Sequence, residues 1–445
     1  MERAKLIVKN FGPLKDIDIE VREMVTFIGA QASGKSTLAK LISIFEDDDF
    51  RRSSKATFET ELHKYNIYSY LNENTFIEYK NSESVFPFTL KFSSSKFEKQ
   101  TAPHSIELFK EIKTKDHYIT KDITILAFKL SIYWSIEHCE SYDPNFEAKI
   151  LNLFPEKKQK TKFINYYFNP ENRPSFRGNL ADEILNILNR EKKTESYIQL
   201  YETLISCFSN IFLYDSIYIP TERNILGIIS TNILGLINNN IQIPKYLLNS
   251  GQEYEKAINT IKELPLTIID KKINYKREGK TSYIYHNLNE KVDLLESASG
   301  LQSVVPILLL VEYSKTLKEE YNFNFVVEEP ELNLYPKAQH ELIKYLVKNC
   351  LFDRKNLILT THSPFVLASI NNLLLAYDKG LTNPKEVNKI IKKESWLNPK
   401  NFIAYELKNG KAKKIMNDKL GQISENMIDS VSDSFADEFN KLLDL

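Results

Sequence analysis

The chain has 445 residues and carries 59 Lys and Arg against 59 Asp and Glu, so its formal net charge is zero. A chain of this length can bury a large core and should fold as more than one domain or lobe. Its neutral balance gives no overall electrostatic signal for nucleic acid, although DNA binding through a local basic patch stays open.

Three cysteines, Cys139, Cys207 and Cys350, stand far apart in the sequence. This spacing argues against a zinc site or a disulfide framework and fits a reducing cytoplasm. The N-terminus shows no signal-peptide core. The longest apolar run, at 304–311, is far below the ~18 residues that a membrane span needs. We therefore expect a cytoplasmic protein that has no membrane partner.

The first 45 residues alternate apolar and polar side chains, a pattern that predicts β-strands. Residues 5–9 and 14–21 should form two strands joined by a turn, and residues 24–28 a third. A helix is expected from 35 to about 45. Antiparallel strands ahead of the third strand predict a mixed sheet rather than a purely parallel one.

The stretch MVTFIGAQASGKST, at 24–37, fits the pattern Gly-x-x-x-x-Gly-Lys-Ser/Thr between a strand and a helix. Such a loop turns backbone N–H groups around phosphate oxygens, and the helix directs its positive end at them. Lys35 would reach the β- and γ-phosphates, and Ser36 would hold Mg²⁺. A chance loop in an unrelated fold is the weaker alternative. The expected nucleotide-binding residues of this loop are Gly29, Ala30, Gln31, Ala32, Ser33, Gly34, Lys35, Ser36 and Thr37.

The middle of the chain is more varied. Residues 57–71 are predicted to be helical, 75–79 and 86–92 to form a strand pair, and 122–210 to be mainly helical. The compact basic run at 157–162 is expected to be a solvated loop, with nucleic-acid or partner binding as the alternative.

A strand at 217–220 is predicted to end in Thr-Glu-Arg-Asn. A charged pair directly after a strand end is where α/β folds place ligand-facing groups. Arg223 is therefore a candidate for contact with a phosphate or with a neighbouring subunit. An ordinary ion pair with Glu222 or another carboxylate is an equal alternative.

Three further motifs follow in the C-terminal part. Ser299 and Gly300 head an apolar helix at 304–317, where Ser299 should cap the helix and leave N–H groups free for an anion. Alone, this is a common capping pattern. An apolar strand at 323–327 then delivers the adjacent carboxylates Glu328 and Glu329.

Two acids that end a buried strand are costly without a cation. One acid, Glu328, would support Mg²⁺, and the next, Glu329, would polarise an attacking water. His362 follows another apolar strand at 356–361, where it can hydrogen-bond a γ-phosphate or the water. In isolation, a capped core histidine is the more common explanation of such a residue.

Taken in order, these motifs resemble those of the ABC-type ATPases of the SMC and OLD-like group. The resemblance covers about 1–100 and 290–410. It implies an α/β P-loop head with a mixed β-sheet and a large, mainly helical insertion. Two such heads would sandwich ATP between the phosphate loop of one subunit and the signature serine of the other. ATP and Mg²⁺ are the implied cofactors, and a homo-oligomer, at least a head-to-head dimer, is the implied assembly.

The resemblance also implies residue roles. Glu328 is the Walker B acid that binds the metal with Ser36, Glu329 is the catalytic base, and His362 is the switch histidine. Lys35 is the third catalytic residue. Glu328 stands where the family usually has Asp, a departure that implies slow turnover.

Ser299, Gly300 and Gln302 would form the signature that contacts nucleotide from the opposite subunit. Leu301 departs from the family pattern, since a second glycine often stands there.

These features divide the chain into four parts. Residues 1–100 and 291–420 are expected to form the two halves of the ATPase head, with a mainly helical insertion containing strand segments at 101–290. Residues 421–445 are expected to form an acidic amphipathic helix that either docks on the protein's own core or forms an interface. Its apolar residues, spaced by four, are Ile423, Met427, Val431, Phe435 and Phe439.

No Asp-x-Asp pattern follows Pro364, so we expect no nuclease site within this chain. The segments IPTER, at 219–223, and EEPELNLYP, at 328–336, resemble ATPase subunits of bacterial anti-phage systems. That resemblance implies a sensor or scaffold that controls a separate toxin nuclease and responds to a phage-encoded trigger protein. The alternatives are a DNA-engaging SMC-like ATPase of repair or genome maintenance and, less favoured, a transporter subunit.

Overall fold

The computed structural model describes residues 3–47, 50, 57–81, 88–101, 214–230, 243–287, 290–317, 322–351 and 355–443. The helices expected within 122–210 and the basic run at 157–162 lie outside the described residues.

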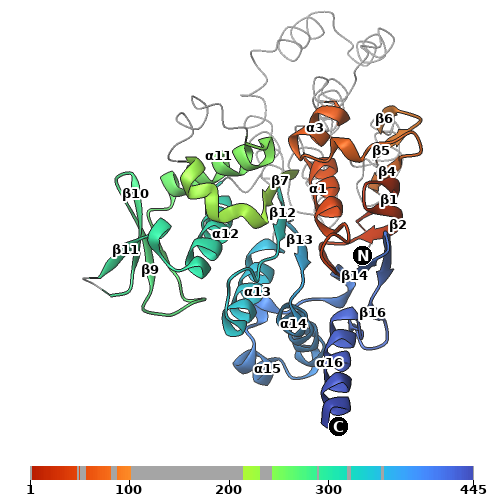
Figure 1. Ribbon diagram of the computed structural model, residues 1–445. Helices are drawn as coiled ribbons and strands as arrows, with labels where there is room; N and C mark the ends of the chain where they lie inside the picture. The colour runs from red at the N-terminus through yellow and green to blue at the C-terminus, as the bar shows by residue number, and fades with distance from the viewer. Residues whose placement is uncertain are drawn as a thin grey trace, which may run out of the picture.

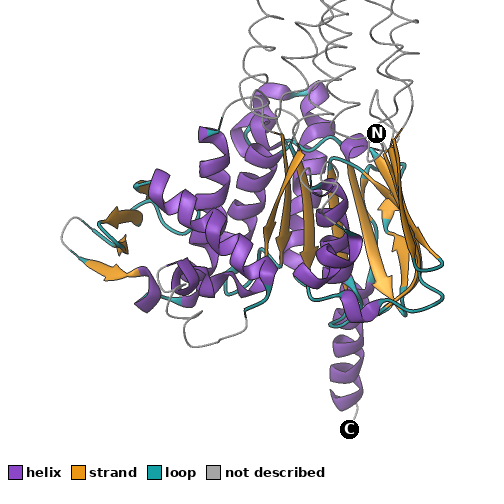
Figure 2. Cartoon of the chain, turned by 90° about the horizontal axis from the view of Figure 1, so that it is seen from above, coloured by secondary structure: helices purple, strands orange, loops and turns teal. Residues whose placement is uncertain are grey.

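Eleven strands of the described part form one mixed sheet at the centre of the molecule (Figures 1 and 2). The strands from β6 to β2 pair antiparallel, whereas β14, β3, β13, β12 and β7 run parallel. The mixed α/β fold predicted from the sequence is therefore confirmed. In spatial order the strands are β6 (Lys96–Thr101), β5 (Phe88–Ser93), β4 (Phe76–Asn81), β1 (Ala4–Phe11), β2 (Leu14–Val21), β15 (Lys411–Lys414), β14 (Phe402–Lys408), β3 (Met24–Gly29), β13 (Asn356–Thr361), β12 (Asn322–Glu328) and β7 (Tyr214–Ile219).

Alternate residues of the central strands face opposite sides of this sheet, and each side has its own hydrophobic core. In β3, Met24 and Ile28 belong to one core, and Val25 and Phe27 belong to the other. Every residue of β3 and of β13 is buried. Helices must therefore cover both faces, as in other parallel sheets.

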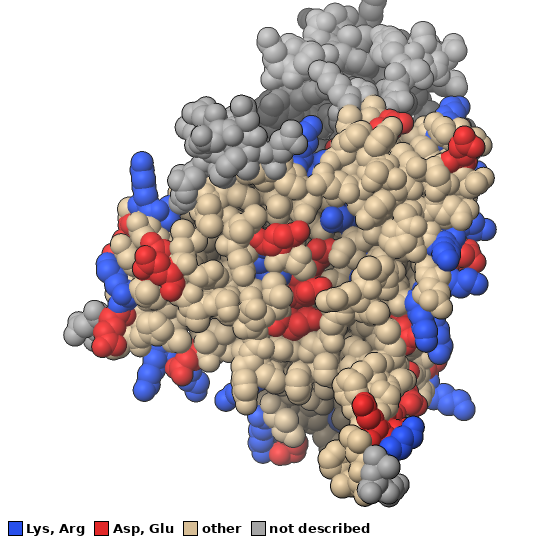
Figure 3. Space-filling model, in the orientation of Figure 1, with Lys and Arg blue, Asp and Glu red and all other residues tan. Residues whose placement is uncertain are grey.

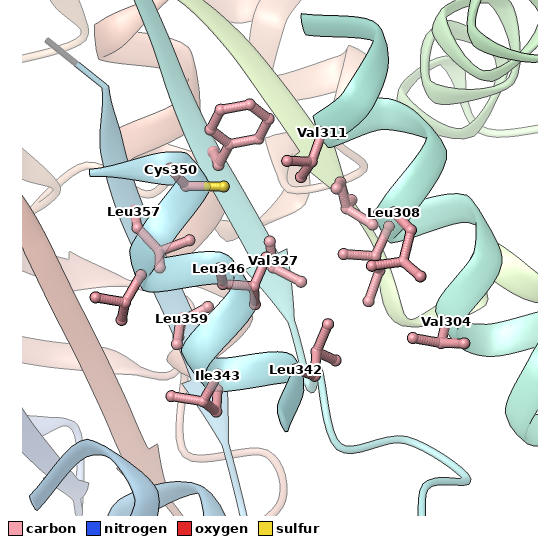
Figure 4. Close-up of a cluster of buried hydrophobic side chains, with 14 of the residues drawn as sticks. Val304, Leu308, Val311, Val327, Leu342, Ile343, Leu346, Cys350, Leu357 and Leu359 are labelled. Atoms are coloured by element: carbon pink, nitrogen blue, oxygen red, sulfur yellow. The ribbon is translucent and has the colours of Figure 1, made fainter. Parts of the chain in front are cut away.

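Helix α1 (Lys35–Glu46) packs on one face of the parallel strands, while α12 (Ser299–Thr316), α13 (Pro336–Cys350) and α14 (Pro364–Thr382) pack on the other. Figure 4 shows how α12 and α13 fill the second core with apolar side chains that meet those of the strands. The labelled residues are Val304, Leu308, Val311, Val327, Leu342, Ile343, Leu346, Cys350, Leu357 and Leu359.

The remaining elements surround this centre (Figure 1). A second, four-stranded sheet combines β8 (Glu263–Pro265), β9 (Asn274–Glu278), β10 (Thr281–Tyr285) and β11 (Lys291–Asp293). The other elements are α3 (Phe58–Lys64), α11 (Lys245–Thr260), α15 (Pro384–Ile390), the pair β16 (Met416–Asn417) and β17 (Gln422–Ile423), and 3-10 turns at Tyr68–Tyr70, Thr221–Ile225, Leu294–Glu296, Lys393–Ser395 and Pro399–Asn401.

The helix expected at 57–71 is shorter than predicted. It ends at Lys64, and Asn66 adopts a left-handed φ of 55° before the next turn. A left-handed residue cannot continue an α-helix. The predicted helix was therefore too long, because the hydrophobic pattern continues beyond Lys64, where the helix ends. Strand β6, which has few apolar residues, was not predicted.

The C-terminal helix α16 (Met427–Leu443) projects away from the body of the molecule (Figures 1 and 2). Its first turn is anchored: the Met427 N–H donates to Glu406, and Ile428 packs against the core. Val431, Phe435 and Phe439 are 47%, 66% and 61% exposed. The helix therefore does not dock its whole apolar face on the protein's own core.

No helix within the described ranges combines the length and the apolar character needed to cross a bilayer.

Leu346→Ala should lower the free energy of unfolding by about 2–5 kcal/mol, because it removes buried methyl groups and leaves a cavity. Leu346 is fully buried in the core of Figure 4. The matched control, Leu381→Ala, alters a side chain that is 70% exposed and should change stability by less than about 0.5 kcal/mol. Urea denaturation followed by circular dichroism measures both. Equal midpoints for the two variants would contradict this core.

Candidate active site at the carboxyl edge of the sheet

Four neighbouring parallel strands end at the same edge of the central sheet. Strand β3 leads into the loop at 29–37, β13 into His362, β12 into Glu329, and β7 into the 3-10 turn that contains Arg223. Parallel strands present their carboxyl ends together, so motifs far apart in the sequence meet here. Figure 3, in the orientation of Figure 1, shows acidic side chains gathered near the middle of the view, where Figure 1 places β12 and β13.

The phosphate loop, residues 29–37, is shaped by left-handed backbone. Ala32 has a φ of 58° and Gly34 a φ of 100°. A Cβ at Gly34 would lie 2.5 Å from Leu14 Cδ2, so space as well as conformation requires glycine there. Helix α1 then begins without a side-chain cap. Its first N–H groups are thereby left for an anion at the loop.

The predicted loop residues differ in accessibility. Ala30, Gln31 and Ser36 are exposed, whereas Thr37 is buried in the first turn of α1. The Ser33 Oγ is buried and has no hydrogen-bond partner. The loop thus combines accessible residues with one buried polar atom that has no partner, an arrangement that fits a binding loop.

The Lys35 side chain folds back into this loop. Its Nζ donates to the carbonyl oxygens of Gly29 and Ala30, at 2.9 Å each. Burial lowers the pKa of Lys35, and the charges of Glu329, Glu331 and Glu328 oppose this effect. The ammonium group therefore lies between the loop and the acids, where a phosphate group could replace its carbonyl partners.

Glu328 ends β12 with a carboxyl that is almost entirely buried, at 3% exposure. Burial raises the pKa of Glu328, while the adjacent Ser36 hydroxyl, the charge of Lys40 and the Tyr218 hydroxyl favour its ionised form. The Oε1 atom has no hydrogen-bond partner. A buried carboxylate oxygen without a partner beside a serine hydroxyl fits a divalent cation, because oxygen ligands are those that Mg²⁺ prefers.

Within the described ranges, no group of three or more His, Cys, Asp or Glu side chains could hold a metal ion. Ser36 and Glu328 would therefore supply only part of a coordination shell. This composition fits an ion that also takes oxygens from phosphates and water, as Mg²⁺ does in nucleotide sites.

Glu329 and His362 face each other across the same edge. The distance from His362 Nε2 to Glu329 Oε1 is 3.2 Å, and both side chains are about one-third exposed, at 32% and 29%. Glu329 has a φ of 42°, unusual for a residue other than glycine. Its N–H donates to the Thr360 carbonyl at 3.0 Å, which fixes β12 to β13 at this turn.

Glu331 also belongs to the site, although no motif in the sequence predicts a role for it. Its Oε1 accepts from the Thr361 hydroxyl at 2.7 Å and from the His362 N–H at 2.8 Å, and burial raises its pKa. This carboxylate fixes the backbone from which the His362 ring projects. The repeated acids of EEPE were the available signal, but a sequence does not show which acid turns inward.

Arg223 lies elsewhere than expected. It is fully buried, so it does not present its charge to a ligand or to a neighbouring subunit. Its hydrogen bonds go to backbone carbonyls rather than to a carboxylate, which corrects the ion-pair alternative as well. The acceptors are the carbonyl oxygens of Ser303 (from Nε, 2.9 Å), Pro220 (from Nη1, 3.1 Å), Glu328 (from Nη1, 2.7 Å) and Glu329 (from Nη2, 2.7 Å).

The signature segment begins α12, with one correction. Ala298 is the N-cap, and Ser299 is the first helical residue and makes no capping hydrogen bond. Ser299 is exposed, and Gln302 Nε2 donates to the carbonyls of Leu295 and Ser297 at 2.8 Å. A Cβ at Gly300 would lie 2.7 Å from the Asn333 carbonyl oxygen, so this glycine permits close packing.

Solved structures similar to this chain include SMC head domains from Pyrococcus furiosus (11% identity, 92% of this chain and 95% of that chain, TM-score 0.36) and Thermotoga maritima (10%, 93% and 98%, TM-score 0.34). Another is the recombination mediator protein RecF, in a structure described as RecF-ATPrS of the RecFOR pathway (14%, 92% and 97%, TM-score 0.31). No curated protein matches the chain.

A family model described as an AAA ATPase domain matches residues 1–367. This span includes the phosphate loop, both acids at the end of β12 and His362. The chain belongs to the AAA ATPase domain family.

Proposed function

We propose that this ATPase binds ATP with Mg²⁺ and hydrolyses it slowly at a site that two copies of the chain share. One observation carries the proposal: at a single sheet edge, Glu328 lies beside Ser36 while Glu329 lies 3.2 Å from His362. One acid is thus directed at the phosphate-loop serine and the other at a histidine. This is the division between metal support and proton transfer that hydrolysis requires.

In this mechanism the partly exposed Glu329 carboxylate accepts a proton from the attacking water, and His362 orients the reacting groups. Lys35 leaves the carbonyls of Gly29 and Ala30 for the phosphate oxygens. Bound Mg²⁺, held by Ser36 and Glu328, supplies positive charge that offsets the charge of the phosphates.

The shared site is supported by the position of the signature. Ser299 is exposed at the start of α12, and no hydrogen bond or ion pair among the described residues joins it to residues 29–37. A signature serine that does not contact the phosphate loop of its own chain is suited to contact a nucleotide held by the phosphate loop of a second copy. The proposed assembly is therefore a homo-oligomer with at least a head-to-head dimer.

We further propose that ATP binding controls a separate effector, a toxin nuclease, in an anti-phage defence system. The proposal rests on the segments at 219–223 and 328–336, which look like those of the AriA subunit of PARIS, with the PtuA subunit of Septu as a close competitor. A phage-encoded trigger protein would release the effector. The alternative function is that of an SMC-like DNA-engaging ATPase of repair or genome maintenance, which the neutral net charge does not favour.

Glu329→Gln should bind ATP with an affinity within threefold of the wild type but lower kcat by about 100-fold or more, because it removes the general base. It should also accumulate as an ATP-dependent dimer, detected by light scattering after size-exclusion chromatography. The control Glu341→Gln alters an acid of α13 that pairs with Lys344 and should keep wild-type turnover. Normal kcat in Glu329→Gln would remove the assignment of the base.

ATP should raise the melting temperature of the wild type more with Mg²⁺ than with a chelator. In Glu328→Gln this difference between Mg²⁺ and chelator should disappear. Because burial raises the folded-state pKa of Glu328, the ionised carboxylate costs stability as pH rises above its unfolded value. Without ligand at pH 8, the variant should therefore unfold no earlier than the wild type. If the Mg²⁺-dependent part of the ATP-induced rise in melting temperature is the same in Glu328→Gln as in the wild type, Glu328 does not bind the metal.

The effector hypothesis is tested by co-purification with the product of the neighbouring gene. Retention of that protein should require ATP, weaken in Lys35→Ala, and fall when the trigger protein is added. Lys385→Ala, an exposed lysine of α15, serves as the charge-matched control. Retention that no nucleotide, variant or trigger changes would count against a sensor role. DNA-stimulated, salt-dependent hydrolysis would instead favour the alternative function.

A further inference from the structure

Arg223 connects three parts of the protein through one buried guanidinium group. The residue follows β7, while its hydrogen bonds reach the turn after β12 and, through the Ser303 carbonyl, the first turns of α12. The turn after β12 and the signature helix α12 are both separate from β7 in the sequence. Arg223 is therefore a physical link between the catalytic acids and the signature helix.

Burying the charged Arg223 side chain costs free energy of folding, so its position calls for an explanation other than stability. Burial lowers the pKa of Arg223 to about 10, and the charges of Glu331, Glu329, Glu328 and Glu222 oppose this effect. A buried guanidinium that meets only carbonyl oxygens loses its hydration without gaining a close ion pair. Apolar residues can fill such a position at similar or better stability. The buried guanidinium is thus better explained by the way it holds the backbone than by a gain in folding stability.

That geometry concerns the junction between the two acids. Nη1 binds the Glu328 carbonyl and Nη2 the Glu329 carbonyl, both at 2.7 Å, so one planar group holds two successive peptide units. Between these units the chain turns through the left-handed φ of Glu329. A residue other than glycine keeps such a conformation only when its surroundings enforce it. The turn sends one carboxylate inward to Ser36 and the other toward His362.

We propose that Arg223 is a positioning residue that fixes the main chain between Glu328 and Glu329 and couples its placement to helix α12. The inference rests on the proposed hydrolysis of ATP and assigns Arg223 no contact with the nucleotide. Movement of α12 when a second copy binds would be transmitted to the base through the Ser303 carbonyl. The group acts on turnover and leaves nucleotide affinity nearly unchanged.

The test compares Arg223→Met, Arg223→Lys and a control, Arg277→Met, in the complete chain. Arg277 is a partly buried arginine of the small sheet, hydrogen-bonded to Ser282. For Arg223→Met we expect kcat to fall about 10- to 100-fold, as for other groups that orient catalytic residues, with the dissociation constant for ATP within threefold of the wild type. Arg277→Met should keep the wild-type kcat.

Arg223→Lys keeps the charge but not the planar guanidinium group, so its kcat should also fall at least tenfold. If Arg223→Met does not fold, Arg223→Lys is the variant that tests the proposal. Wild-type kcat in Arg223→Lys would overturn the proposal, as would equal losses of kcat and ATP affinity in either variant. A wild-type chain without ATPase activity would instead reject the proposed function, and the two failures are therefore distinguishable.

Discussion

Strand β3 is hydrogen-bonded along both sides, by β13 and by β14, and the rest of the site takes its position from this pairing. Met24 lies opposite Leu357 on one side and Phe402 on the other. Because β12 pairs with β13 and β7 with β12, the register set at β3 passes to every strand that ends in a functional group. A slip of one residue at any of these pairs would exchange the two faces of the strand. Glu328 would then leave its place beside Ser36.

The charges at this edge are stabilised in different ways. Arg223 is surrounded by carbonyl oxygens, Lys35 by the carbonyls of its own loop, and Glu331 by a hydroxyl and an N–H. Glu328 Oε1 and Glu331 Oε2 are both buried and have no hydrogen-bond partner. Of these two carboxylates, Glu328 lies beside the Ser36 hydroxyl of the phosphate loop. A cation that also binds phosphate oxygens would therefore be better placed at Glu328 than at Glu331.

Local motifs predicted most of this arrangement because the chemistry of each is contained in a few adjacent residues. The phosphate loop, the paired acids of β12 and the mixed sheet all follow from spacing and alternation. Arg223 and Glu331 could not be assigned in this way. Their roles depend on carbonyl and N–H groups of strands distant in sequence, which side-chain patterns do not encode. The predicted Ser299 cap was wrong by one residue, because Ala298, a residue type that is disfavoured at this position, is the N-cap of α12.

The strand order has a consequence for biosynthesis. The chain makes the phosphate loop early, but both neighbours of β3 are made only after residue 355. Until then the emerging N-terminal part carries a mostly apolar strand with two unpaired edges, a form that favours association with other chains. The site at the carboxyl edge of the sheet is likewise incomplete until β13 and His362 have been translated.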